Sequence, residues 1–317
     1  MDPRCFCTII TRSHLSWALA LVDSVRQFDR ALPFCILVTD TETMEPGAIG
    51  PIEGVEVLFL KDVAKTGLGR DIATKYADKP DELRWSLKPV LMLHLHQRYT
   101  KVIYGDCDLH FFNDPGSLWH ELDDADMLLS PHFRSGRATV DRANFAELFV
   151  GGLYNGGFVA STHRASAPLT RWAENCLEVC VKDLSKGQYV DQTHLNLLPI
   201  YFDRIKVIKH RGCNVANWNM VECRRERSSA GEVLINGVFP IIFIHFTRST
   251  IDGIVSGVDG LLMEHVSILR DRLLAHGSGK DIILAAKERL ARKAEAIVER
   301  GFFERGIRYM VRKVRRS

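Results

Sequence analysis

The amino-terminal part of the chain alternates between short apolar runs and an amphipathic segment. The runs Phe6–Thr11, Phe34–Val38 and Val55–Leu60 predict strands. Between the first two, apolar residues recur on related faces of His14–Phe28, which predicts a helix. Strands that alternate with helices favour a mostly parallel sheet flanked by helices. We therefore expect an α/β fold that binds ligands at the carboxyl ends of its strands.

Polar residues lie in or after these first strands. Thr8 and Thr11 belong to the first predicted strand, and Asp40 follows the second. In a parallel sheet, ligands bind outside the carboxyl ends of the strands. We expect all three residues to lie near a docked nucleotide.

A chain of 317 residues that is 46% hydrophobic and 26% charged has the composition of a soluble globular protein with a sizeable core. Its eight cysteines lack the paired spacing of zinc sites, so we expect free thiols in a reducing cytoplasm. The apolar run Leu15–Val22 lacks the flanks of a secretory signal, and we expect none. The run Val233–Phe246 is too short for a membrane span and contains Pro240, so it predicts a core strand.

A later apolar run, Val102–Tyr104, predicts a buried strand that is followed by two aspartates. Side chains alternate along an extended chain, so Asp106 and Asp108 should project from one side. Two carboxylates at that place suit a hard divalent cation that also binds phosphate oxygens. An ordinary Asp-rich turn is the alternative interpretation. A second pair at the same spacing, Asp124 and Asp126, opens another predicted strand, and we expect a solvated turn there.

Cationic side chains precede this strand, and an imidazole ends a later one. Arg84 and Lys88 are four residues apart in a predicted helix, after a segment, Ala64–Pro80, that predicts a loop or lid. Either cation could meet phosphates that the metal holds; a solvated basic face is the alternative. His245 ends a strongly apolar strand, as Asp106 does, and is either a metal ligand or a structural histidine.

Two further segments carry polar groups suited to a sugar. Glycines on both sides of Asn155 let the backbone approach a ligand, and its amide can donate to and accept from hydroxyl groups. A glycine-lined hairpin without a ligand is the alternative. Asp191 precedes a predicted helix, where it suits an N-cap role and equally a functional one.

The order of these motifs resembles that of GT-A glycosyltransferases. The residues that carry the resemblance are Gly105-Asp106-Cys107-Asp108-Leu109, Tyr154-Asn155-Gly156-Gly157-Phe158, Asp191-Gln192 with Leu195-Asn196, and Ile244-His245-Phe246. The pattern is similar to the retaining enzymes of glycosyltransferase family eight, such as glycogenin and the bacterial lipooligosaccharide galactosyltransferases. The resemblance extends in motif order from about Phe6 to Thr250.

This resemblance implies a sugar-nucleotide donor and a manganese or magnesium ion. It implies that Asp106, Asp108 and His245 bind the metal, which bridges the two phosphates of the donor. Charge builds on the departing diphosphate in the transition state, and Arg84 or Lys88 would help the metal to stabilise it.

The same resemblance implies which residues surround the donor sugar. Asn155, Gly156 and Gly157 would lie near it, and Asp191 and Gln192 beside its anomeric carbon. Retaining enzymes of this kind lack a well-placed strong nucleophile, which favours front-face attack by the acceptor hydroxyl with help from the leaving phosphate. Asp191 and Gln192 would then position the sugar and ease its oxocarbenium character.

The carboxyl-terminal residues are more basic than the rest. Residues 263–317 contain fourteen Lys plus Arg against seven Asp plus Glu, and an apolar stripe at helical spacing continues through Phe303–Val314. We expect a GT-A catalytic domain over residues 1–262 and a basic amphipathic helical region over residues 263–317. That region suits an anionic membrane surface; packing on the body or a partner is the alternative. Nucleic acid is not an expected partner, because aromatic stacking platforms are absent.

Together these features predict a metal-dependent glycosyltransferase that moves a sugar from a nucleotide-diphosphate sugar, with retention, to a glycan or lipid-linked acceptor. We expect UDP-hexose as donor and a role in bacterial surface polysaccharide synthesis, in the cytoplasm at the inner face of the membrane. A sugar-1-phosphate nucleotidyltransferase is one alternative, although Thr11-Arg12-Ser13-His14 lacks the glycine-rich loop that it would need. A non-catalytic GT-A-like binding protein is another, which the intact acidic and imidazole motifs disfavour.

Overall fold

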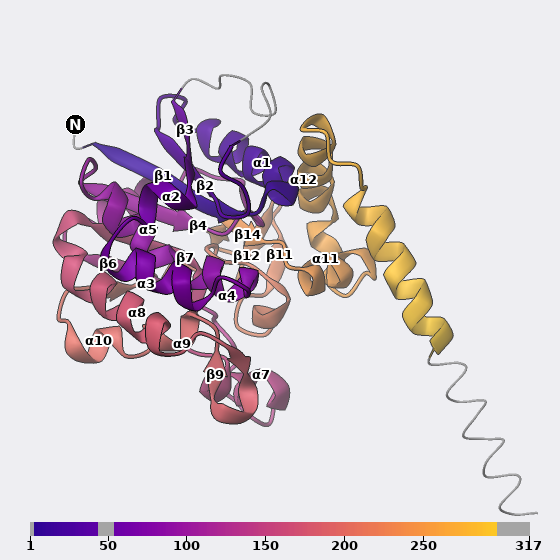
Figure 1. The fold of residues 1–317 in the computed structure, drawn as a ribbon. Coiled ribbons are helices and arrows are strands. Elements are labelled where there is room, and N and C mark those ends of the chain that lie inside the picture. Colours follow the sequence, from indigo (N-terminus) through magenta and orange to yellow (C-terminus); the bar gives the residue numbers. More distant parts are fainter. Residues whose placement is uncertain (1–2, 44–53, 297–317) are drawn as a thin grey trace, which may run out of the picture.

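The computed structural model describes residues 3–43 and 54–296 (Figure 1). A sheet of seven strands runs through its centre in the order β10-β6-β7-β4-β1-β2-β3. The strands are β1 (Arg4–Ile10), β2 (Phe34–Val38), β3 (Val55–Phe59), β4 (Lys101–Gly105), β6 (Met127–Pro131), β7 (Tyr154–Thr162) and β10 (Ile205–Val207). β7 is antiparallel to both of its neighbours, and the other neighbouring strands are parallel. The mostly parallel sheet of an α/β fold is confirmed.

Both faces of the sheet are apolar and covered by helices. Along β1, Cys5 and Cys7 belong to one hydrophobic cluster and Phe6 and Ile10 to another, because successive side chains point to opposite faces. The first cluster includes residues of α5 (Lys88–Leu95) and α8 (Ser166–Glu178), and the second includes residues of α1 (Leu15–Arg26) and α6 (Gly116–Glu121). Burial on two faces explains why these strands are continuous apolar runs.

The loop or lid expected over Ala64–Pro80 is wrong. The segment follows α2 (Leu60–Val63) and is mostly helical, in α3 (Gly67–Lys75) and the start of α4 (Pro80–Ser86). Ile72 and Tyr76 are four residues apart, both are buried, and the hydroxyl of Tyr76 donates to the backbone oxygen of Cys176 in α8 at 2.8 Å. Packing of this apolar pair outweighed the glycines and charges from which a loop was predicted.

The single core strand expected over Val233–Phe246 is also wrong, because the run is divided. It contains β12 (Val233–Ile235), β13 (Phe239–Pro240) and β14 (Phe243–His245). Asn236 and Gly237 have positive φ angles of 53° and 70°, which turn the chain so that β12 and β13 pair antiparallel. β14 then pairs antiparallel with β5 (Leu109–Phe111), and His245 lies opposite Leu109.

Helices of the carboxyl-terminal region pack on the body. α11 (Arg248–Val255), α12 (Met263–Ala275) and a further helix over residues 282–296 lie beside one another at one end of the molecule (Figure 1). One hydrophobic cluster contains Ile251 and Ile254 together with Leu269, Leu273 and Ile283. Residues from both sides of position 262 therefore share a core, and the expected boundary there stays a prediction. The predicted stripe through Phe303–Val314 lies outside the described residues.

Shorter elements complete the described part of the chain. They are α7 (Arg142–Val150), α9 (Gln192–Leu195), α10 (Leu198–Tyr201), β8 (Lys182–Asp183), β9 (Gln188–Tyr189) and β11 (Arg225–Arg227). The eight cysteines are free thiols. Across residues 3–43 and 54–296, no helix has the length and apolar character needed to cross a membrane.

Candidate active site

Two carboxylates and one imidazole converge where three strands begin or end. Asp106 follows β4, Asp108 precedes β5, and His245 ends β14. Each offers one ligand atom, and these atoms all lie within 4.8 Å of one another. Since β14 pairs with β5, His245 lies opposite Leu109 and next to Asp108, although it is far away in sequence. Carboxylate oxygens with an imidazole nitrogen form a donor set that suits Mn²⁺ or Mg²⁺.

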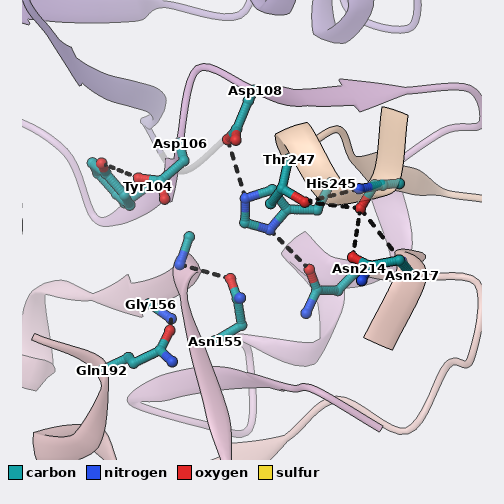
Figure 2. A network of polar contacts seen from close by, with 12 residues as sticks. Tyr104, Asp106, Asp108, Asn155, Gly156, Gln192, Asn214, Asn217, His245 and Thr247 are labelled. Carbon is teal, nitrogen blue, oxygen red and sulfur yellow. Dashed lines mark hydrogen bonds and ion pairs between the residues drawn. The ribbon is translucent and has the colours of Figure 1, made fainter. Parts of the chain in front are cut away.

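His245 is held between two side chains, as Figure 2 shows. Its Nε2 lies 3.1 Å from Asp108 Oδ1, and its Nδ1 lies 3.3 Å from Asn214 Oδ1. Because an amide oxygen only accepts hydrogen bonds, Asn214 places a proton on Nδ1 and directs Nε2 toward the carboxylates. A hydrogen bond of this kind fixes the tautomer of a metal-binding histidine and orients its ring.

The pKa values of this pair are shifted in opposite directions. Burial acts to lower the pKa of His245, but the carboxylates of Asp108 and Asp106 together outweigh it and hold that pKa above its usual value. Burial acts to raise the pKa of Asp108, but His245, a backbone hydrogen bond and Lys88 together outweigh it, so that pKa lies below its usual value. The structure thus favours a carboxylate–imidazolium pair, in which a divalent cation can replace the proton on Nε2.

Gly157 leaves space that two of the three ligand groups, Asp106 and His245, occupy together with Asn155. A Cβ atom at this position would lie 2.6 Å from His245 Cε1, 2.7 Å from Asn155 Oδ1 and 2.9 Å from Asp106 Oδ2. The Gly157 N–H also donates to Asn155 Oδ1 at 2.8 Å, and its carbonyl oxygen accepts from the Asp106 N–H at 2.8 Å. Together with the donor set, this crowding shows that the residues present fit a divalent cation.

Lys88 connects the carboxylates of two motifs. Its side chain is buried, and Nζ donates to the Gly156 oxygen at 2.9 Å while lying 3.4 Å from Asp106 Oδ1 and 3.3 Å from Asp191 Oδ2. Burial acts to lower the pKa of Lys88, but the two carboxylates outweigh it and raise that pKa. Lys88 is therefore charged. Tyr104 Oη adds a hydrogen bond of 2.6 Å to Asp106 Oδ1.

Asp191 is buried with one oxygen incompletely satisfied. It occupies the N-cap position of α9 but makes no capping hydrogen bond. Its Oδ2 has no hydrogen bond, since Lys88 Nζ approaches it at ion-pair distance without hydrogen-bond geometry. Burial raises the pKa of Asp191 to about 6, although Lys88 opposes the shift. Asp191 Oδ2 points toward Gly156, where a Cβ atom would lie only 2.7 Å away.

Asn155 and Gln192 fix the backbone between these groups. Asn155 is buried on β7, with Nδ2 3.2 Å from His132 Nε2. Gln192 Oε1 accepts from the Gly156 N–H at 3.3 Å, and its Nε2 donates to the Gly151 oxygen at 2.6 Å. Gly156 and Gly157 thus lie on a central strand of the sheet, with their backbone groups held by side chains.

A cavity of about 1280 Å³ adjoins the carboxylates. Asp106, Asp108 and Lys88 line it, and so does Arg84 of α4, which is ion-paired with Asp81. Arg84 and Lys88 therefore face one cavity, but Lys88 is the one that contacts the carboxylates. Further lining residues are Ser13, His14, Trp17, Trp85 and several from the carboxyl-terminal helices.

The three polar residues expected near a nucleotide have different surroundings. Thr8 is fully buried, and its Oγ1 has no hydrogen bond. Thr11 Oγ1 contacts His14 Nδ1 at 2.9 Å, and Asp40 Oδ1 accepts from the Arg12 N–H at 2.8 Å. Thr11 and Asp40 thus hold the turn that leads to Ser13 and His14, which line the cavity. Thr8, Thr11 and Asp40 themselves are not among the lining residues.

The second aspartate pair lies elsewhere. Asp126 Oδ1 accepts from Arg164 Nε at 2.8 Å and from Arg204 Nε at 2.9 Å, and Asp124 is exposed. The solvated turn expected there is therefore only partly right, because Asp126 is paired. Spacing alone did not distinguish the two pairs; the buried strand before Asp106 did.

Sequence reasoning did not identify Asn214 as a partner of His245, nor the buried His132 beside Asn155. Trp218 was also missed, and its ring centroid lies 5.3 Å from that of His245 and 5.6 Å from that of His132. The mixture of amide and aromatic residues over 214–219 is the sequence signal that could have found two of the three.

No protein-family model matches the chain. Two uncharacterized proteins of Bacillus subtilis (strain 168) are similar in sequence. YfnF is 26% identical over 255 residues, covering 76% of this chain and 80% of YfnF. YfnD is 28% identical over 255 residues, covering 78% of each protein.

Solved structures similar to the chain include the galactosyltransferase LgtC, in complex with donor and acceptor sugar analogues. It is 17% identical, with a TM-score of 0.48, and the match covers 76% of this chain and 86% of LgtC. Mouse xyloside xylosyltransferase 1 in its apo form is 13% identical, with a TM-score of 0.46, over 79% of this chain and 99% of that protein. Both of these solved structures are of glycosyltransferases.

Proposed function

We propose that the chain is a metal-dependent glycosyltransferase that moves a sugar from a nucleotide-diphosphate sugar to a glycan or lipid-linked acceptor. The observation that carries the proposal is the convergence of Asp106, Asp108 and His245 from separate strands, within 4.8 Å of one another. Lys88 joins this cluster to Asp191, the residue that the motif resemblance assigns to the donor sugar. We propose Mn²⁺ or Mg²⁺ as the cation and UDP-hexose as the donor.

The residues of the site would have different roles in such a transfer. Asp106, Asp108 and His245 would hold the cation, which would neutralise charge on the donor's phosphates. Lys88 keeps a positive charge between Asp106, on the metal side of the site, and Asp191, on its sugar side. Lys88 is buried, and a low dielectric constant strengthens the effect of its charge on a leaving diphosphate.

The sugar side of the site is acidic and closely packed. With a pKa of about 6, Asp191 is mostly ionised at neutral pH and can stabilise positive charge at an anomeric carbon. Gln192 keeps the Gly156 backbone in place beside it. The motif resemblance supports attack by the acceptor on the face that the diphosphate leaves, with retention. We also propose a role in surface polysaccharide synthesis at the inner membrane face, for which the basic carboxyl-terminal region is the supporting feature.

The test is calorimetry of UDP-glucose and UDP-galactose with and without Mn²⁺. We expect binding that requires Mn²⁺ and that is lost in Asp106→Asn and Asp108→Asn, with slow release of UDP as donor is hydrolysed. Asp124→Asn is the matched control, because Asp124 is exposed and belongs to the pair that lies elsewhere. Unchanged Mn²⁺-dependent binding in Asp106→Asn would reject the metal site. Formation of UDP-sugar from UTP and a sugar 1-phosphate would identify a nucleotidyltransferase instead.

A further inference from the structure

The cavity beside the carboxylates is larger than one small ligand requires. Its volume is about 1280 Å³, against roughly 300–1,000 Å³ for typical ligand pockets. In the proposed function the donor occupies the part next to Asp106 and Asp108. The lining continues to Phe246, Arg248 and Ile251 and then to the carboxyl-terminal segment between residues 277 and 292. Space for a second substrate therefore lies between the donor site and this segment.

Cations without an acidic partner line this second part. Among the described residues, Arg248, Lys280 and Arg292 form no ion pair, and all three are exposed to the cavity solvent. The cations of the lining that do have carboxylate partners are Arg84, Lys88 and Arg289. Three unpaired positive charges around one cavity attract an anion.

Acidic groups in the same segment do not cancel this charge. Asp281 lines the cavity, but its Oδ1 accepts from the backbone N–H groups of Ile283 and Leu284 at 2.8 and 3.0 Å, in the first turn of the helix over 282–296. Glu288 is the other acidic residue of the segment that lines the cavity. Among the described residues of this segment that line the cavity, Glu288 is thus the one carboxylate without a hydrogen bond or ion pair, against three unpaired cations.

The segment packs on the body, which fixes the backbone positions of Lys280 and Arg292 relative to Arg248 of α11. Arg289 donates to Asp252 of α11, with Nη2 2.6 Å from Oδ1, and Lys293 Nζ lies 3.4 Å from Oδ2 of the same residue. Ile282 and Ala286 are buried in the hydrophobic cluster that also contains residues of α11. Figure 1 shows the helix over 282–296 beside α11.

Apolar side chains adjoin the cations. Ile251, Ile282 and Phe246 line the cavity, as does Leu284, which is 55% exposed. Phe246, Ile251 and Ile282 are already buried, so Leu284 is the one of the four that a ligand can cover. An inorganic anion would gain nothing from it, whereas an apolar chain would bury it. We propose that this part of the cavity binds the acceptor, and that the acceptor carries a phosphate or diphosphate on an apolar chain, held by Arg248, Lys280 and Arg292. The inference rests on the proposed function, because the donor defines which part of the cavity remains.

The test uses the full chain with Mn²⁺ and saturating UDP, so that the donor site is filled and no transfer occurs. Geranyl phosphate is titrated by calorimetry, with geraniol and inorganic phosphate as the comparison ligands. We expect geranyl phosphate to bind at least tenfold more tightly than either, because it alone has both the charge and the chain. Lys280→Gln and Arg292→Gln should each weaken it about tenfold, because each removes one charge-assisted contact with the phosphate. Lys287→Gln is the matched control, because Lys287 is exposed on the same helix but does not line the cavity.

Three results would overturn the inference: equal binding of inorganic phosphate, unchanged affinity in the Lys280→Gln and Arg292→Gln double variant, or displacement of UDP by geranyl phosphate. Failure of the proposed function is seen separately, as absence of Mn²⁺-dependent UDP binding in the unaltered chain. In that case the titration of geranyl phosphate without UDP still measures whether the three cations bind a phosphate. UDP binding that persists in the double variant shows that the donor site is intact.

Discussion

Lys88 and Asp191 form an ion pair in which Nζ lies 3.3 Å from Oδ2 and both side chains are almost completely buried. Lys88 also reaches Asp106 at 3.4 Å, so one ammonium group neutralises carboxylates from two distant parts of the sequence. A buried charge without a partner is strongly unfavourable. The metal side and the sugar side of the proposed site therefore depend on the same cation for their stability.

Lys88→Met should lower the free energy of unfolding by about 3–5 kcal/mol, because it leaves the buried carboxylate of Asp191 and the part-buried one of Asp106 without their cation. Adding Asp191→Asn should recover part of this loss, since the second substitution removes the more deeply buried of the two charges. Urea denaturation at pH 7 without metal measures both effects. Strictly additive losses in the double variant would contradict the pairing.

Asp191 should also make stability depend on pH. The folded protein raises its pKa to about 6, whereas an unfolded aspartate has a pKa of about 3.9. The folded state therefore binds this proton more tightly. The resulting contribution to the free energy of unfolding is fully present below about pH 4 and is lost as the pH rises through 6. In metal-free urea denaturation between pH 4 and 7, the free energy of unfolding of the unaltered chain should fall relative to that of Asp191→Asn, by about 2–3 kcal/mol.

The control for this comparison is Asp124→Asn, since Asp124 is exposed. Its stability curve should run parallel to that of the unaltered chain. If the curve for Asp191→Asn were also parallel to that of the unaltered chain, burial would not raise the pKa of Asp191.

The sequence predicted the sheet well because its strands are buried on both faces and are therefore apolar throughout. It also located Asp106 and Asp108, since a polar pair directly after a buried strand lies at the carboxyl end of that strand. It could not show how His245 reaches them. That depends on the turn at Asn236 and Gly237 and on the pairing of β14 with β5, neither of which follows from the spacing of residues.

Partners that are far apart in sequence were missed for the same reason. Lys88 was assigned to a phosphate, but its contact with Asp191 joins residues 103 positions apart. The fixed hydrogen bond from His245 to Asn214 spans 31 positions. The predicted loop over Ala64–Pro80 failed because glycine content was given more weight than two apolar residues at helical spacing, Ile72 and Tyr76.

Gly157→Ala should weaken Mn²⁺ binding at least tenfold while the protein still folds. The added Cβ would lie within 3 Å of His245, Asn155 and Asp106, so the ligand groups must move apart. Changes in the groups that orient metal ligands typically cost about 10–100-fold in affinity. Calorimetric titration with Mn²⁺ measures the affinity, and thermal unfolding without metal measures the fold.

Gly253→Ala is the control for that substitution. Gly253 lies in α11, and a Cβ atom there would have no heavy-atom neighbour within 4 Å. Alanine is the better helix former, so this variant should be at least as stable as the unaltered chain and bind Mn²⁺ equally well. Normal Mn²⁺ affinity in Gly157→Ala would show that the cation does not bind among Asp106, Asp108 and His245.

The last prediction concerns how the helix over residues 282–296 is attached. Arg289→Gln should raise amide hydrogen exchange across this helix about fivefold or more, because Arg289 loses a part-buried, charge-assisted contact with Asp252. Exchange in the central sheet should stay unchanged, since the strands pack in other hydrophobic clusters. Lys287→Gln, on the exposed side of the same helix, should leave exchange unaltered. If Arg289→Gln left it unaltered too, apolar packing of Ile282, Ile283 and Ala286 alone would hold the helix, and the cations along the cavity would not depend on the Asp252 ion pair.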